Sequence, residues 1–151
     1  MWWLRRARPD VLLMQETKLT DADAPVAAFR DEGYELAHHG EGRWNGVAIA
    51  SRVGIADVVA NFGEPMRKAR TPEAGDDEPF AEARMIGATC GEVRVVSVYA
   101  PNGRSVGSPF YEAKLACARF FMTRLLPETN TLFTTATSGS QTLMALPAEA
   151  F

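Results

Sequence analysis

The stretch Asp10-Val11-Leu12-Leu13-Met14-Gln15-Glu16-Thr17-Lys18 decides how this chain folds. Its four consecutive apolar residues are too few to cross a membrane, and they fit a short strand buried on both faces. The strand ends at Gln15 and Glu16, so a carboxylate lies where the backbone leaves the core. A metal ligand or catalytic acid is held in this way, and an ordinary solvated strand end has the same pattern. Position alone leaves both interpretations of Glu16 open.

The composition is that of one globular domain with a real core. The chain has 151 residues, of which 46% are hydrophobic and 23% charged, and no apolar run has the length of a membrane helix. A net charge of −3 excludes a global basic signature for nucleic acid but leaves room for a local basic patch. Cys90 and Cys117 have neither metal-site spacing nor the density of a disulfide scaffold. We therefore expect both thiols to be reduced and the protein to be cytoplasmic.

The rest of the pattern predicts an α+β fold. Capping chemistry in residues 20–25 and a glycine stop at Gly33 predict a short helix. A second helix is expected from Ser108 to Pro127 on apolar spacing. His38 and His39 are interpreted as a strand-end surface. Strands joined as antiparallel hairpins are expected over residues 34–38, 47–51, 55–62, 83–90 and 93–99.

The chemistry of the chain changes after Pro127. Eight Ser or Thr residues and no charged side chain lie between Thr129 and Thr142. We expect residues 1–127 to form a partial domain and residues 128–151 a weakly structured Ser/Thr-rich tail. The helical pattern at Trp2 also lacks a start signal. These features predict a chain that is incomplete at both ends, with its sequence read out of frame from about Cys117.

A set of segments in fixed order resembles one enzyme family. The segments are Gln15-Glu16-Thr17-Lys18, Arg43-Trp44-Asn45-Gly46, Glu82-Ala83-Arg84, Tyr99-Ala100-Pro101-Asn102-Gly103 and Tyr111-Glu112-Ala113-Lys114. In this order and spacing they resemble exodeoxyribonuclease III and the related abasic-site endonucleases, within the endonuclease/exonuclease/phosphatase superfamily. The resemblance covers roughly residues 7–116.

The resemblance implies a fold and an activity. The fold is a partial four-layer α/β sandwich of mixed, mostly antiparallel sheets flanked by helices. The activity is hydrolysis of phosphodiesters in duplex DNA at abasic sites or from 3′ ends, assisted by Mg²⁺ or Mn²⁺. We expect a DNA repair nuclease that is a monomer and has no membrane partner.

The resemblance also implies roles for individual residues. Glu16 would be the metal-binding carboxylate and Tyr99 the catalytic tyrosine near the scissile phosphate. The DNA-binding positions would be Asn102, Lys18, Trp44 and Arg84.

Each of these residues has a purely structural alternative. Tyr99 could cap the sheet as a half-buried strand residue, and Asn102 could serve only its Asn-Gly turn. Trp44 could cover the core instead of facing DNA, and Arg84 could pair only with acidic groups near Glu82.

The family's mechanism needs groups that the sequence lacks. An N-terminal asparagine, a Gly-Asp-Xaa-Asn element and a Ser-Asp-His element are missing, since the last aspartate is Asp77 and the last histidine is His39. Hydrolysis requires an activated water and charge stabilisation together, so we expect this chain to be inactive. We also expect the second half of the sandwich to be missing and the apolar face of residues 93–98 to lie uncovered.

Two other functions stay open. The chain could be a non-catalytic fragment that binds nucleic acid weakly. It could also be a superfamily phosphatase that acts on inositol phosphates or lipids, because those branches share the Gln-Glu element. The Tyr99–Gly103 segment favours the DNA branch.

Overall fold

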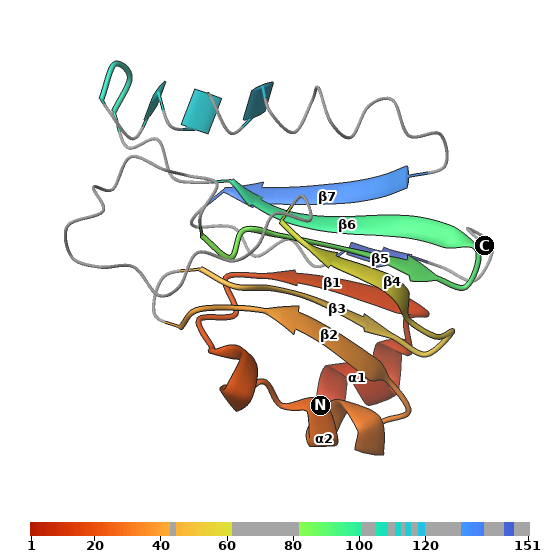
Figure 1. The fold of residues 1–151 in the computed structure, drawn as a ribbon. Helices are drawn as coiled ribbons and strands as arrows, with labels where there is room; N and C mark the ends of the chain where they lie inside the picture. Colours follow the sequence, from red (N-terminus) through yellow and green to blue (C-terminus); the bar gives the residue numbers. More distant parts are fainter. Residues whose placement is uncertain are drawn as a thin grey trace.

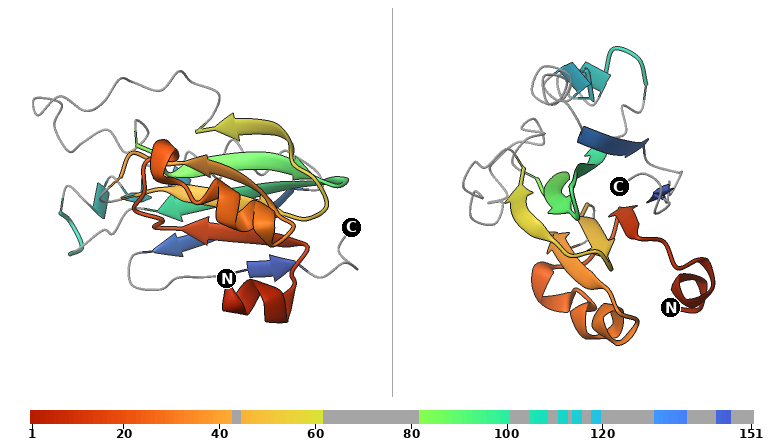
Figure 2. Two further views of the ribbon diagram at one scale, coloured as in Figure 1. Left: turned by 90° about the horizontal axis from the view of Figure 1, so that it is seen from below. Right: turned by 90° about the vertical axis from the view of Figure 1, so that its right-hand side faces the viewer.

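A computed structural model describes residues 1–42, 45–61, 82–100, 105–108, 111–112, 114–115 and 118–119, and the backbone of two further strands at 131–137 and 144–146. Two four-stranded sheets lie face to face, with α1 (Trp2–Ala7) and α2 (Val26–Asp31) across the outer face of the first (Figures 1 and 2). The predicted class, a partial α/β sandwich flanked by helices, is confirmed. Within the described ranges no helix has the length and apolarity needed to cross a bilayer.

The first sheet has β1 at its centre. Its order is β2-β3-β1-β8, from β2 (Glu35–His39), β3 (Val47–Ser51), β1 (Val11–Gln15) and β8 (Met144–Leu146), and every neighbouring pair is antiparallel. Val11 and Leu13 are fully buried on one face of β1, and Leu12 is 4% exposed on the other. The prediction of a strand buried on both faces is confirmed.

The second sheet has the order β4-β5-β6-β7. These strands are β4 (Ala56–Ala60), β5 (Met85–Cys90), β6 (Val93–Ala100) and β7 (Thr131–Thr137). The β4–β5 and β5–β6 pairs are antiparallel, whereas β6 and β7 are parallel. The expected hairpins β2–β3 and β5–β6 are present. β3 and β4 form no hairpin, because the chain crosses from one sheet to the other between Ser51 and Ala56.

The core between the sheets follows the two-residue alternation of strands. Its inward side chains come from β1, β3, β5 and β6, and include Val11, Leu13, Val47, Ile49, Ile86, Ala88, Cys90, Val95 and Tyr99. The expectation that residues 93–98 would lie uncovered is wrong, because Val95 packs against the first sheet inside this core. On the other face of β6, Val96 and Val98 are 2% and 3% exposed and cluster with Met85.

A second cluster joins the helices to the first sheet. Leu4 of α1 and Phe29 of α2 pack on Leu12 and Ala50, the outward residues of β1 and β3. The helix α2 ends in a Schellman motif, with the Gly33 amide bonded to Arg30 and the Tyr34 amide to Phe29. Gly33 has φ +83°, so the predicted glycine stop is confirmed.

Other expectations are met only in part by described residues. The capping segment forms a short 3-10 helix, η1 (Asp21–Asp23), before α2, and Thr20 caps it by accepting from the Asp23 amide. Residues 111–112, 114–115 and 118–119 are helical, where the second helix was expected. Cys90 is a free, buried thiol and Cys117 lies outside the described residues. β7 pairs with β6 and β8 pairs with β1, and both strands fall in residues 128–151. The domain boundary at residue 127 stays a prediction.

Candidate functional site

The turn after β1 holds Glu16 at the rim of the sandwich. Glu16 and Lys18 have φ values of 52° and 56°, in the left-handed region that non-glycine residues avoid. Neighbouring backbone holds this turn in place: the Thr17 amide donates to the Gly46 carbonyl at 3.2 Å, and the Lys18 amide to that of Asn45 at 2.9 Å. Left-handed residues cost about 1–2 kcal/mol each and are found at functional sites when the surroundings hold them.

Glu16 and Lys18 form an ion pair with unequal burial. The Lys18 Nζ lies 3.5 Å from Glu16 Oε2, and the two side chains are 58% and 17% exposed. The carboxylate is therefore mostly enclosed while the ammonium faces solvent.

Tyr99 comes from the second sheet to the same place. Its amide donates to the Arg84 carbonyl at 2.7 Å, and the Arg84 guanidinium carbon lies 5.1 Å from the centre of the tyrosine ring. Burial, a hydrogen bond to Glu16 and the charge of Glu16 raise the pKa of Tyr99 to about 12, against the opposing effect of Arg84. The Tyr99 phenol is thus protonated at neutral pH, and it can donate a hydrogen bond but cannot act as a base.

Arg84 carries unused hydrogen-bond donors. It forms an ion pair with Glu82, yet its Nε and Nη1 atoms are buried and have no hydrogen-bond partner among the described residues. The Oδ1 atom of Asn45 is also buried and has no hydrogen-bond partner among the described residues. A buried donor left unpaired costs about 1–3 kcal/mol. A phosphate oxygen would satisfy the guanidinium, which binds phosphate as a planar fork.

The two sheets are also joined by polar contacts next to this site. Gln15 Nε2 donates to Ser97 Oγ at 3.1 Å, and Ser97 Oγ donates to the Met14 carbonyl at 3.1 Å. Gly46 donates its amide to the Ala83 carbonyl at 3.1 Å. These bonds fix the end of β1 relative to β5 and β6, and hence Glu16 relative to Tyr99.

The structure thus brings Glu16, Tyr99 and Arg84 together, with Lys18 beside Glu16. Trp44 and Asn102 lie outside the described residues. Arg84 makes the pair with Glu82 that was its structural alternative, and it also lies over Tyr99. The functional roles of all six residues stay predictions.

The described residues do not complete a metal site. Among them no group of three or more His, Cys, Asp or Glu side chains could hold a metal ion. Glu16 is a hard oxygen ligand of the kind Mg²⁺ accepts, but Mg²⁺ needs six ligands in octahedral geometry.

One feature of this rim was missed by sequence reasoning. His38 Nδ1 lies 2.7 Å from Asp21 Oδ1, and His38 Nε2 lies 2.8 Å from Thr17 Oγ1. The interpretation of His38 and His39 as surface is wrong, because the His38 side chain is 4% exposed and His39 is 2% exposed. Burial lowers the pKa of His39, so it is neutral at pH 7. No local signal joins Asp21 to His38, since the contact forms only when β2 folds back beside η1.

Solved structures share this architecture. An AP endonuclease from Archaeoglobus fulgidus superposes with a TM-score of 0.74 at 30% identity, over 88% of this chain and 48% of that chain. A 3′-5′ exonuclease from Neisseria meningitidis gives 0.63 at 30% identity, over 84% and 46%. The fold is nuclease-like. A 3′ phosphatase from Neisseria bound to a product DNA hairpin gives 0.67 at 29% identity, over 89% and 49%.

These neighbours support the nuclease superfamily that the sequence resembles. The chain spans about half the length of each. A family model described as acetyl-CoA dehydrogenase C-terminal like matches residues 94–147. That match covers about a third of the chain. It includes β6 and β7 of the second sheet and β8 of the first, but none of the other five strands, so it does not account for the nuclease-like fold.

Proposed function

We propose that this chain carries the first half of a DNA repair nuclease site of the exonuclease III type, in which a DNA phosphate binds beside Glu16, Tyr99 and Arg84. One observation carries the proposal: Tyr99, at the end of the β-hairpin β5–β6, interacts with both the Glu16 carboxylate and the Arg84 guanidinium. Both sheets contribute to this cluster, because Glu16 follows β1 of the first sheet and Tyr99 lies in β6 of the second. The Neisseria neighbour described as bound to a product DNA hairpin supports DNA as the partner.

The residues have distinct parts in this proposal. Arg84 would bind the phosphate through its guanidinium, whose Nε and Nη1 atoms have no hydrogen-bond partner among the described residues. Tyr99 would donate a hydrogen bond to the same phosphate, because its pKa of about 12 keeps it protonated. Lys18, which is exposed, would contact the DNA backbone. Trp44 and Asn102 would also bind DNA.

Glu16 would contribute one ligand to Mg²⁺ or Mn²⁺. When bound, such an ion offsets the charge that builds on the phosphate oxygens. The other ligands must come from residues that the described part does not supply.

We further propose that this chain binds DNA without cleaving it. The missing Gly-Asp-Xaa-Asn and Ser-Asp-His elements would activate the water and complete the metal site. Loss of either function costs several orders of magnitude in rate. A protein that only binds DNA is therefore the second candidate function for this chain.

A duplex oligonucleotide with one abasic site tests these proposals. Nicking in the presence of Mg²⁺ should not exceed the rate seen with EDTA. Fluorescence anisotropy should detect weak binding of the duplex that Arg84→Gln reduces about tenfold, the effect of losing a charged hydrogen bond. Arg30→Gln, an exposed cation of α2, is the matched control and should leave the affinity unchanged.

Two outcomes would contradict the proposals. Mg²⁺-dependent nicking that Glu16→Ala abolishes and Glu35→Ala preserves would show that the chain is a complete catalyst. Equal DNA affinity of the Arg84→Gln, Arg30→Gln and parent proteins would remove Arg84 from the binding site.

A further inference from the structure

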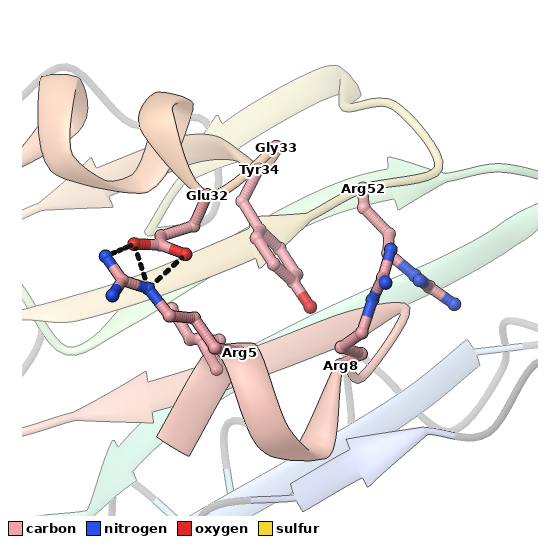
Figure 3. A pocket seen from close by; sticks show the side chains of 7 residues that line it. Arg5, Arg8, Glu32, Gly33, Tyr34 and Arg52 are labelled. Atoms are coloured by element: carbon pink, nitrogen blue, oxygen red, sulfur yellow. Dashed lines mark hydrogen bonds and ion pairs between the residues drawn. The ribbon is translucent and has the colours of Figure 1, made fainter. Parts of the chain in front are cut away.

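The opposite end of β1 from Glu16 borders a cavity with a basic wall. The cavity has a volume of about 420 Å³ and opens between α1, α2 and the end of β3 (Figure 3). It is lined by Leu4, Arg5, Arg8, Glu32, Gly33, Tyr34 and Arg52. Three of these seven residues are arginines, in a chain whose net charge is −3. A cavity of this size can hold a small organic ligand.

Two of the three arginines have acidic partners. Arg5 makes a forked contact with Glu32, with Nε 2.8 Å from Oε1 and 2.9 Å from Oε2. Arg52 Nε donates to Asp10 Oδ1 at 2.6 Å, and the Asp10 side chain is 7% exposed. The arrangement of these two pairs leaves Arg8 as the cation without an ion pair among the described residues.

Arg8 is held in an unusual backbone conformation. It follows α1 with φ 44° and ψ 51°, in the left-handed region, and its amide closes the helix on the Leu4 carbonyl at 2.9 Å. Glycine or asparagine is the usual residue at such a helix end. The bulkier arginine therefore costs backbone energy here without gaining an ion pair in return.

The side chains of Arg8 and Arg52 line the same cavity. In Figure 3 both lie on the side of the Tyr34 ring that is away from the Arg5–Glu32 pair. Burial raises the pKa of Tyr34, and the nearby charges of Arg52 and Arg8 both oppose that rise, so both guanidinium groups lie near the phenol. The Tyr34 hydroxyl donates to the Pro9 carbonyl at 2.6 Å, which fixes this wall of the cavity.

We propose that this cavity is a binding site for a phosphomonoester, held between the guanidinium groups of Arg8 and Arg52. Asp10 already balances the charge of Arg52, so Arg8 is the cation of this cavity that an anion would neutralise. A carboxylate has two oxygens and is satisfied by one arginine fork, whereas a phosphomonoester has three acceptor oxygens and a charge near −2. It can accept from both forks at once while Asp10 stays paired with Arg52. This site goes beyond the proposed nuclease function and does not depend on it.

Isothermal titration calorimetry of the full chain with inorganic phosphate and with ribose 5-phosphate tests the site. Acetate is titrated in the same way as the carboxylate for comparison. We expect both phosphates to bind more tightly than acetate. Arg8→Gln should weaken phosphate binding about tenfold, the effect of one charged hydrogen bond. The matched variant Arg30→Gln makes the same charge change on exposed α2 outside the cavity, and it should bind phosphate like the parent.

Circular dichroism melting shows whether Arg8→Gln folds, and Arg8→Lys provides a second test. Lysine keeps the charge but lacks the fork, so Arg8→Lys should also bind more weakly than the parent. The proposal is overturned if the parent protein does not bind phosphate, or if Arg8→Gln and Arg30→Gln bind it equally. Loss of duplex DNA binding in Arg8→Gln without loss of phosphate binding would overturn it too, because the arginine would then belong to a nucleic-acid surface.

Discussion

His38 Nε2 lies 2.8 Å from the hydroxyl oxygen of Thr17, the residue between Glu16 and Lys18. The other ring nitrogen of His38 meets Asp21, whose carboxylate also accepts from the Gly40 amide at 2.8 Å. The Thr17 hydroxyl in turn packs directly against Gly46, where a Cβ would overlap it. The chain Asp21–His38–Thr17 therefore fixes the turn that carries Glu16.

Removing the His38 ring should loosen this turn. His38→Ala deletes a buried side chain and leaves the Thr17 hydroxyl unpaired, so we expect a loss of about 2–3 kcal/mol in the free energy of unfolding. Urea denaturation followed by circular dichroism measures it. Glu35→Ala, an exposed change on the same strand, is the control and should alter stability by less than about 0.5 kcal/mol. Equal stability of the two variants would contradict a structural role for His38.

Gly46 should accept no larger residue. Its φ is +109°, and a Cβ there would overlap the Thr17 hydroxyl. We expect Gly46→Ala to lower the free energy of unfolding by more than about 2 kcal/mol, since backbone strain and overlap add. Gly54→Ala is the matched control, because Gly54 also has a positive φ of +94° but open space around its Cβ position. A smaller effect at Gly46 than at Gly54 would show that Thr17 moves aside without cost.

The pKa of Tyr99 predicts a loss of stability in alkali. Its folded pKa of about 12 lies above the ordinary value of 10.0, so the folded protein holds the phenolic proton more tightly than the unfolded chain. Stability from this group is complete below pH 10 and is lost as pH rises toward 12, by about 2 kcal/mol in all. Urea unfolding at pH 9, 10 and 11 measures the fall.

Tyr99→Phe provides the control for that prediction. The variant lacks the proton, so its stability should fall less steeply between pH 10 and 12 than that of the parent. The absorbance of tyrosinate reports how many of the three tyrosines are ionised. Near pH 11 it should be lower in the folded parent than in the same chain unfolded in urea. A Tyr99 that ionises near pH 10 would contradict its contact with Glu16.

Local pattern was sufficient to predict much of the fold. The β-branched residues of β6 and the apolar run of β1 were sufficient to predict these two buried strands. Gly33 ends α2 where expected. Pairing between distant strands carries no such local signal. The separation of β3 from β4 into different sheets, and the covering of Val95 by the first sheet, both depend on long-range packing.

For the candidate site, the sequence could predict which residues take part but not how they lie in space. The resemblance named Glu16, Tyr99 and Arg84, and their closeness is a property of the folded chain. The contact of His38 with Asp21 could not be predicted, because 17 positions separate them and neither residue belongs to a recognisable motif.

The cross-sheet bond of Ser97 should matter for stability. Ser97→Ala would leave the buried Gln15 amide and the Met14 carbonyl without this partner, so we expect a loss of about 1–3 kcal/mol in the free energy of unfolding. Thr89→Ala removes a hydroxyl from the neighbouring strand β5, where Thr89 is only half-buried and its contact with Asp57 is 3.4 Å long. This control should lose less than about 1 kcal/mol. A Ser97 variant as stable as the parent would mean that a water replaces the hydroxyl.

The two arginine–carboxylate pairs near α1 should contribute differently to the free energy of unfolding. Arg52→Gln leaves the Asp10 carboxylate buried and uncompensated, and we expect a loss of about 2 kcal/mol, reduced from the fully buried case because Arg52 is 35% exposed. The Arg5–Glu32 pair has comparable geometry but Arg5 is 70% exposed, so water replaces the contact when Arg5→Gln removes it. Urea denaturation of both variants at low and high salt measures the difference. Equal losses of stability in the two variants would show that the burial of Asp10 does not make its ion pair more stabilising than the exposed one.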